Sequence, residues 1–111
     1  MAKITVDLNE KAVSFERDKE GNRKPLFDDR PNANVGWCLN YYILAPCRDQ
    51  PPAKIIGWIF EIDDNGKLEG MDETDFDLLK KIIEDDRNTG ALIKGQILAA
   101  MKKSKDAVEK A

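Results

Sequence analysis

The stretch NVGWCLNYYILAPCRDQPPAKIIGWIFEI, residues 34–62, decides which fold the sequence predicts, because it contains two strongly apolar segments. CRDQPP separates them, and its two prolines favour a turn. In a strand, successive side chains point to opposite faces, and in each segment the residues of both faces are mostly apolar. This pattern is typical of strands covered on both faces. The sequence therefore predicts two central strands, residues 35–44 and 54–62.

Before this stretch, alternating residues predict a β-hairpin over residues 3–17. KITVDL places Ile4, Val6 and Leu8 on one face of a strand, and AVSFERD places Val13 and Phe15 on one face of the next. Residues 19–34 are rich in Gly, Asn, Pro and charge, so we expect a long loop there.

After this stretch, the spacing of apolar residues predicts two C-terminal helices, residues 73–86 and 89–105. Thr74 is the predicted N-cap of the first helix. Gly95 weakens the second helix unless it allows close packing. Strands followed by helices indicate an α+β fold: one antiparallel sheet of about four strands, with both helices on one face. The length predicts a single domain over residues 1–111.

The composition is that of a soluble globular protein, with 41% apolar and 35% charged residues. No apolar run is long enough to cross a bilayer, and MAKITVDLNEK lacks the apolar core of a signal peptide. We therefore expect a protein of the cytoplasm, or of the host cytoplasm if the source is a virus. In that compartment Cys38 and Cys47 are expected as reduced thiols.

The chain contains no histidine, which excludes Ser–His, Cys–His and His–metal mechanisms. No pairing of carboxylates, lysines or tyrosines indicates catalysis, so we expect no enzymatic activity and no cofactor. The net charge is −3 and no basic stripe alternates with aromatic residues, which argues against direct nucleic-acid binding.

Acidic residues concentrate in the middle of the chain, where residues 61–77 hold eight acids and Lys67 as the one base. Such a surface could bind a basic groove that normally holds nucleic acid. Alternatively, the carboxylates stabilise a helix N-terminus through its dipole. The residues of the partner-binding interpretation are Glu61, Asp63, Asp64, Glu69, Asp72, Glu73 and Asp75.

A calcium loop is the alternative interpretation of EIDDNGKLEGMD, residues 61–72. Its ligands would be Glu61, Asp63, Asn65, Glu69 and Asp72. Glu replaces the usual Asp at the first position, Asp replaces the bidentate Glu at the twelfth, and a predicted strand replaces the preceding helix. A β-turn at the Asn-Gly pair competes with this interpretation.

The predicted sheet has one face that its helices cannot cover. On that face we place Cys38, Tyr42, Leu44, Ile55 and Ile59. Burying one such side chain stabilises by about 1.5–3 kcal/mol, so either the 19–33 loop or a second chain should cover them. A two-fold homodimer is the simplest solution. The sequence thus predicts a non-enzymatic protein–protein interaction module, for example an inhibitor or accessory factor of a nucleic-acid-handling protein; a calcium-binding regulatory protein is the alternative.

Overall fold

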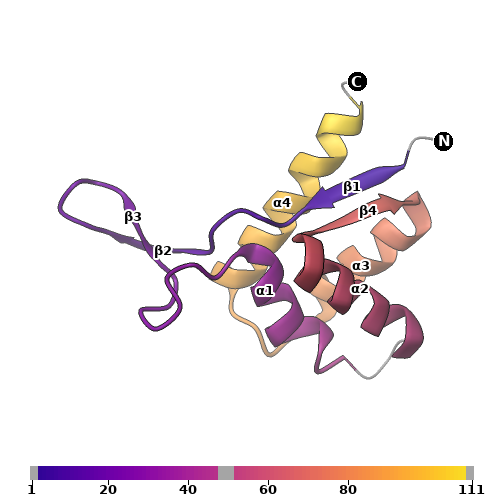
Figure 1. Ribbon diagram of the computed structural model, residues 1–111, viewed down its shortest axis with the longest axis horizontal. Helices are drawn as coiled ribbons and strands as arrows, with labels where there is room; N and C mark the ends of the chain where they lie inside the picture. The colour runs from indigo at the N-terminus through magenta and orange to yellow at the C-terminus, as the bar shows by residue number, and fades with distance from the viewer. Residues whose placement is uncertain (1–2, 48–51, 110–111) are drawn as a thin grey trace.

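The computed structural model describes residues 3–47 and 52–109, which form an α+β fold of small antiparallel sheets and helices (Figure 1). Its elements are β1 (Ile4–Asp7), β2 (Val13–Arg17), β3 (Arg23–Pro25), α1 (Val35–Leu39), the π-helical segment η1 (Asn40–Leu44), α2 (Pro52–Asn65), β4 (Lys67–Met71), α3 (Glu73–Asp85) and α4 (Ala91–Glu109). The α+β class is confirmed, and the two predicted C-terminal helices match α3 and α4 approximately. Within the described ranges, no helix has the length and apolar character needed to cross a membrane.

The two predicted central strands, residues 35–44 and 54–62, are wrong, because both segments are helical. An apolar run without a clear polar face fits a buried helix as well as a buried strand. Local signals favour the helix. The Asn34 side chain caps α1 by accepting a hydrogen bond from the Trp37 amide at 2.7 Å. Pro52 opens α2, at a position where a helix needs no amide donor.

Helical phase decides which apolar residues of α2 reach the core. Ile55, Trp58 and Ile62 are buried, at the spacing of one helix face. Ile56 and Phe60, which a strand would have placed on the same face as Trp58 and Ile62, are 49% and 59% exposed. The segment is therefore a helix that buries one apolar face and leaves Ile56 and Phe60 exposed on its outer side.

The strands do not form one sheet, and the predicted hairpin over residues 3–17 is wrong. β1 pairs with β4, with Ile4 opposite Met71 and Val6 opposite Leu68, and β2 pairs with β3. Alternation in a sequence shows which face of a strand is buried, but it does not identify the strand's partner. The segment predicted as a long loop, residues 19–34, instead contains β3.

The β2–β3 hairpin projects from the body of the protein (Figure 1), and we call residues 13–25 the arm. None of its residues is buried. The Asp18 carboxylate organises the tip by accepting hydrogen bonds from the amides of Glu20 at 2.9 Å and Asn22 at 3.0 Å. Gly21 turns the chain there with a φ of 86°, which glycine tolerates.

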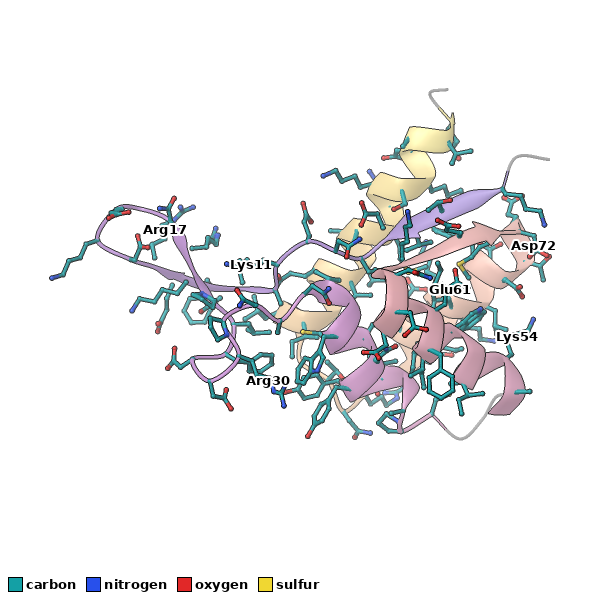
Figure 2. The ribbon with its side chains drawn as sticks, in the orientation of Figure 1. Lys11, Arg17, Arg30, Lys54, Glu61 and Asp72 are labelled. Atoms are coloured by element: carbon teal, nitrogen blue, oxygen red, sulfur yellow. The ribbon has the colours of Figure 1, made fainter. Side chains whose placement is uncertain are left out.

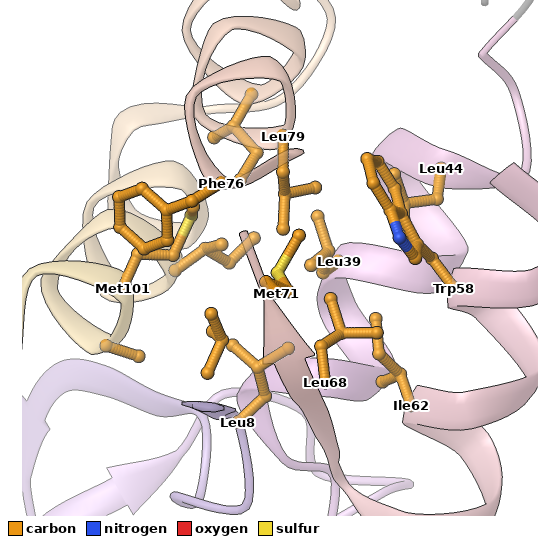
Figure 3. Close-up of a cluster of buried hydrophobic side chains, with 14 of the residues drawn as sticks. Leu8, Leu39, Leu44, Trp58, Ile62, Leu68, Met71, Phe76, Leu79 and Met101 are labelled. Carbon is orange, nitrogen blue, oxygen red and sulfur yellow. The ribbon is translucent and has the colours of Figure 1, made fainter. Parts of the chain in front are cut away.

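One hydrophobic core lies among β1, β4 and the helices, and the arm contributes no residue to it (Figure 3). Leu8, Leu39, Leu68, Leu79 and Met101 are each almost completely buried in it. These residues come from segments throughout the sequence, so the core depends on contacts between distant parts of the chain.

Two polar side chains of α4 form hydrogen bonds with the backbone of β1 and β2, in the way that a neighbouring strand would. The Ser104 hydroxyl accepts from the Asp7 amide at 3.1 Å. Gln96 accepts from the Val13 amide at 2.9 Å and donates to the Val13 carbonyl at 2.8 Å. These bonds satisfy backbone groups that the two-stranded sheets leave unpaired.

We expect Gln96→Ala to lower the free energy of unfolding by about 1 kcal/mol, because the Val13 amide and carbonyl lose their partner. Urea denaturation followed by far-UV circular dichroism measures this change. Lys102→Ala, on the exposed side of the same helix, is the matched control and should change stability by less than about 0.5 kcal/mol. Equal values for the two variants would contradict the role assigned to Gln96.

Candidate protein-binding surface

Four aromatic side chains gather where α1 and η1 meet the segment that follows the arm. We call Phe27, Trp37, Tyr41 and Tyr42 the aromatic surface. Trp37 and Tyr41 stack with ring centroids 4.9 Å apart and planes 10° apart. Phe27 meets Trp37 edge-on at 5.6 Å. Trp37 and Tyr41 are one helical turn apart, so the helix that the sequence did not predict brings them together.

The aromatic surface lies partly in solvent. Tyr41 is 60% exposed, and the other three rings are half-buried. The guanidinium carbon of Arg30 lies 4.9 Å from the centre of the Trp37 ring, in a cation–π contact (Figure 2). A central strand covered on both faces would bury Tyr41, and its exposure contradicts that expectation.

A cavity of about 460 Å³ lies beside the aromatic surface, and Trp37 belongs to both. Arg30, which contacts the Trp37 ring, also lines the cavity. Asp29 and Asp63 bring carboxylates to it from the loop after the arm and from the end of α2. These groups suit a ligand that offers positive charge or hydrogen-bond donors.

Asn40, at the start of η1, also lines this cavity. Its amide nitrogen donates to the Ile59 carbonyl at 3.0 Å, which ties η1 to α2. Its carboxamide oxygen is buried and has no hydrogen-bond partner within the described parts of the chain. An unpaired buried acceptor and a π-helical segment are both uncommon and are often found at functional sites.

Burial raises the pKa of the Tyr42 hydroxyl above its ordinary value, with smaller contributions from Cys38, Tyr41 and Asp29. The direction of this shift keeps Tyr42 neutral at physiological pH. The ring therefore offers the aromatic surface an apolar body and a hydroxyl group, without a charge.

Three of the predicted acidic residues lie at the start of α3, as the helix-dipole interpretation expects. Asp72 caps the helix by accepting from the Asp75 amide at 2.8 Å, so Asp72 and not Thr74 is the N-cap. Asp75 also pairs with Lys54 at 2.7 Å. Glu73 lies in the first turn of α3. These carboxylates therefore have structural roles. Figure 2 labels Asp72 and Lys54 at this end of the protein.

The other four predicted acidic residues lie on α2 and β4. Glu61 accepts a hydrogen bond from the Glu69 amide at 2.6 Å, and Glu69 pairs with Lys67 at 3.1 Å. Asp63 lines the cavity. Asp63 and Asp64 make no side-chain hydrogen bond or ion pair with any described residue, which leaves them the freest carboxylates of the predicted set.

The geometry does not favour the calcium alternative. A helix does precede the loop, contrary to expectation, but α2 continues through Asn65 and carries Glu61 and Asp63 within it. Glu69 lies in β4, and Asp72 caps α3. Across residues 3–47 and 52–109, no three His, Cys, Asp or Glu side chains form a group that could hold a metal ion. We expect calcium titration calorimetry to show no saturable heat, and a saturable heat would restore this alternative.

The predicted apolar sheet face does not exist as a surface. Cys38, Leu44 and Ile55 are buried in the core, while Tyr42 and Ile59 are half-buried against it. The helices of the chain itself cover these residues, so the argument for a homodimer from that face no longer holds. The error follows directly from treating the two helical segments as strands.

Both cysteines are free, and they should differ in reactivity. Burial raises the pKa of the Cys38 thiol from 9.0 to about 11. We expect a thiol reagent near pH 8 to modify half-buried Cys47 in the native protein and Cys38 only after unfolding. Rapid modification of both thiols would contradict the burial of Cys38.

Folding raises the pKa of Cys38, so the folded state favours the protonated thiol. The free energy of unfolding should therefore fall as the pH rises from 9.0 toward 11.

Comparison with known proteins found no matching family model, curated protein or solved structure. The fold and the surface define a small α+β protein with a partly exposed aromatic cluster beside a polar cavity. The functional argument therefore rests on the residues of this chain.

Proposed function

We propose that this protein is a non-enzymatic protein–protein interaction module that binds through the aromatic surface and its cavity. The observation that carries the proposal is the exposure of Tyr41 beside Trp37 and Arg30. Tyr, Trp and Arg are the residues that most often supply the binding energy of protein interfaces. Rings held against each other lose little conformational freedom on binding, so their burial adds directly to affinity.

The cavity indicates the kind of partner. Asp29 and Asp63 favour a basic side chain, while the rings favour an apolar or aromatic one. A partner segment that combines both would match the surface. Because part of the attraction is between charges at the surface, added salt should weaken it.

An inhibitor or accessory factor of a nucleic-acid-handling protein is one form of this proposal. Asp63 and Asp64, next to each other at the end of α2, are the acidic residues best placed to contact a basic groove. The other predicted acidic residues have partners within the chain, and we expect them to contribute less to binding.

Affinity capture from source-cell lysate with matched baits tests the proposal. We expect one protein to be retained by the wild type and by Phe60→Ala, and to be lost with Tyr41→Ala. Phe60 is a suitable control because it is 59% exposed, close to the 60% of Tyr41, but lies on α2 outside the aromatic surface. Asp63→Lys should reduce capture at low salt more than at high salt. If no captured protein distinguishes Tyr41→Ala from Phe60→Ala, the proposal fails.

A further inference from the structure

The arm buries none of its own residues, and its bonds to α4 are those that Gln96 makes with its first residue, Val13. Internal bonds define its shape: Arg17 donates to the Gly21 carbonyl at 2.6 Å, and Arg23 donates to the Phe15 carbonyl at 2.9 Å. Ordering a chain costs conformational entropy, and a two-stranded hairpin with no apolar face against a body is marginally stable in water. A second surface that packs against the arm would supply the missing burial.

The chemistry of the arm indicates what that surface should be. Phe15 is 72% exposed. Arg17 and Arg23 lie opposite each other in the hairpin, and one nitrogen of each guanidinium bonds the backbone. The arm also carries Lys19 and Lys24, so its basic residues outnumber its three acidic residues. One of these acids, Asp18, is bonded to backbone amides at the tip. The arm therefore offers an aromatic ring close to guanidinium groups.

The aromatic surface offers the complementary groups. Its exposed ring, Tyr41, can pack against a phenyl ring, and Asp29 and Asp63 in the cavity can accept from a guanidinium. The stacking of Arg30 on Trp37 shows that this surface already accommodates a guanidinium against a ring. The arm of the same copy projects away from the body and is not seated there (Figure 1).

The position of the two surfaces favours closed symmetry. Phe27 follows the end of the arm by two residues, so the aromatic surface lies at the root of the arm (Figure 2 marks Arg30 there). Two copies related by a two-fold axis could then exchange arms, each arm reaching the surface beside the other's root. Such an exchange occupies the arm and the aromatic surface of both copies, so neither is left to bind a third copy.

We propose that the aromatic surface of one copy receives the arm of a second copy, giving a two-fold dimer with exchanged arms. This inference rests on the proposed function, since it uses the same surface, and it identifies the partner as the chain itself. The contact joins Phe15 and the arm guanidiniums of one copy to Tyr41, Asp29 and Asp63 of the other.

Sedimentation velocity over a wide concentration range tests the inference on the whole chain. We expect a reversible dimer of the wild type. Phe15→Ala and Tyr41→Ala should each raise the dissociation constant about tenfold or more, because each removes an aromatic contact twice per dimer. Phe60→Ala is the matched control and should leave the constant unchanged. Thermal melts of all variants should match the wild type, since these side chains are exposed.

A mixing experiment tests the exchange itself. Phe15→Ala has a damaged arm and an intact surface, and Tyr41→Ala has the reverse. A mixed dimer therefore keeps one intact arm-to-surface contact, whereas either variant alone keeps none. We expect the mixture to associate more strongly than either variant at the same total concentration.

Three results would overturn the inference: a wild-type monomer at every concentration, a dimer that tolerates both variants, or no recovery on mixing. A monomer whose Tyr41 is required to capture another protein from lysate would overturn the exchanged dimer and leave the proposed function intact. If neither the capture experiment nor the sedimentation experiments depend on Tyr41, both the proposed function and the exchanged dimer are wrong.

Discussion

Trp58→Ala is expected to lower the free energy of unfolding by about 3–5 kcal/mol, a large part of the stability of a domain of this size. Trp58 is 8% exposed and lies in the core near Leu44 and Leu39 (Figure 3). Removing the indole leaves a cavity that neighbouring elements cannot fill without moving. Urea denaturation followed by far-UV circular dichroism measures the loss without relying on the fluorescence of the deleted residue.

Phe60→Ala is the control for this prediction, because Phe60 is also aromatic and lies in the same segment. Phe60 is 59% exposed, so we expect a change within about 0.5 kcal/mol. A strand would place Trp58 and Phe60 on one face, and both variants would then lose similar stability. Similar losses would therefore contradict the helical assignment of α2.

Gly36→Ala is expected to lower the free energy of unfolding by about 1–3 kcal/mol through overpacking. A Cβ atom at Gly36 would lie 2.7 Å from Cγ2 of Ile62 and 3.2 Å from Cβ of Leu8. Ile62 and Leu8 are both buried, so neither can move away freely. Glycine is thus required where α1 approaches α2 and the end of the first strand. Urea denaturation again provides the measurement.

Gly57→Ala and Gly95→Ala are the matched controls, with the opposite expected sign. Both glycines lie within helices, and a Cβ atom at either would meet no neighbour within 4 Å. Each substitution should raise stability by up to about 1 kcal/mol, because alanine favours the helix. Gly95 therefore does not serve close packing. If Gly36→Ala also stabilised the protein, the tight approach of α1 to α2 would be wrong.

The C-terminal helices could be predicted because their sequences show one apolar side and one charged side. The predicted ranges 73–86 and 89–105 correspond to Glu73–Asp85 and Ala91–Glu109. In α3 the buried residues Phe76, Leu79 and Ile83 follow the helical repeat without ambiguity. Propensity, pattern and burial agree in these segments.

The segment 34–62 could not be predicted correctly from its apolar pattern, because apolar residues occur on every side of it. Capping residues carried the missing information. Asn34 is an N-cap, and Gly66, with a φ of 69°, ends α2 by donating to the Ile62 carbonyl at 2.7 Å. The Asn-Gly pair fits the β-turn expected from the sequence, but it also fits the end of a helix.

The candidate site was only partly accessible from the sequence. Asp63 was among the predicted partner-binding residues and does line the cavity. The exposure of Tyr41 could not be predicted, because it depends on the phase of a helix in a segment whose pattern predicts a strand covered on both faces. The pairing of β1 with β4 could not be predicted either, since complementary strand partners far apart in the sequence leave no local signal.

The bond from the Asp7 amide to Ser104 joins residues 97 positions apart, and this has a consequence for synthesis on the ribosome. The first strand has no partner until β4 emerges, and its edge has no cover until α4 emerges. Ile4, Val6 and Leu8 must therefore stay exposed at least until the residues of α4 have been translated. We expect the nascent chain to acquire its protease resistance late and in one step, and to be a substrate for chaperones until then.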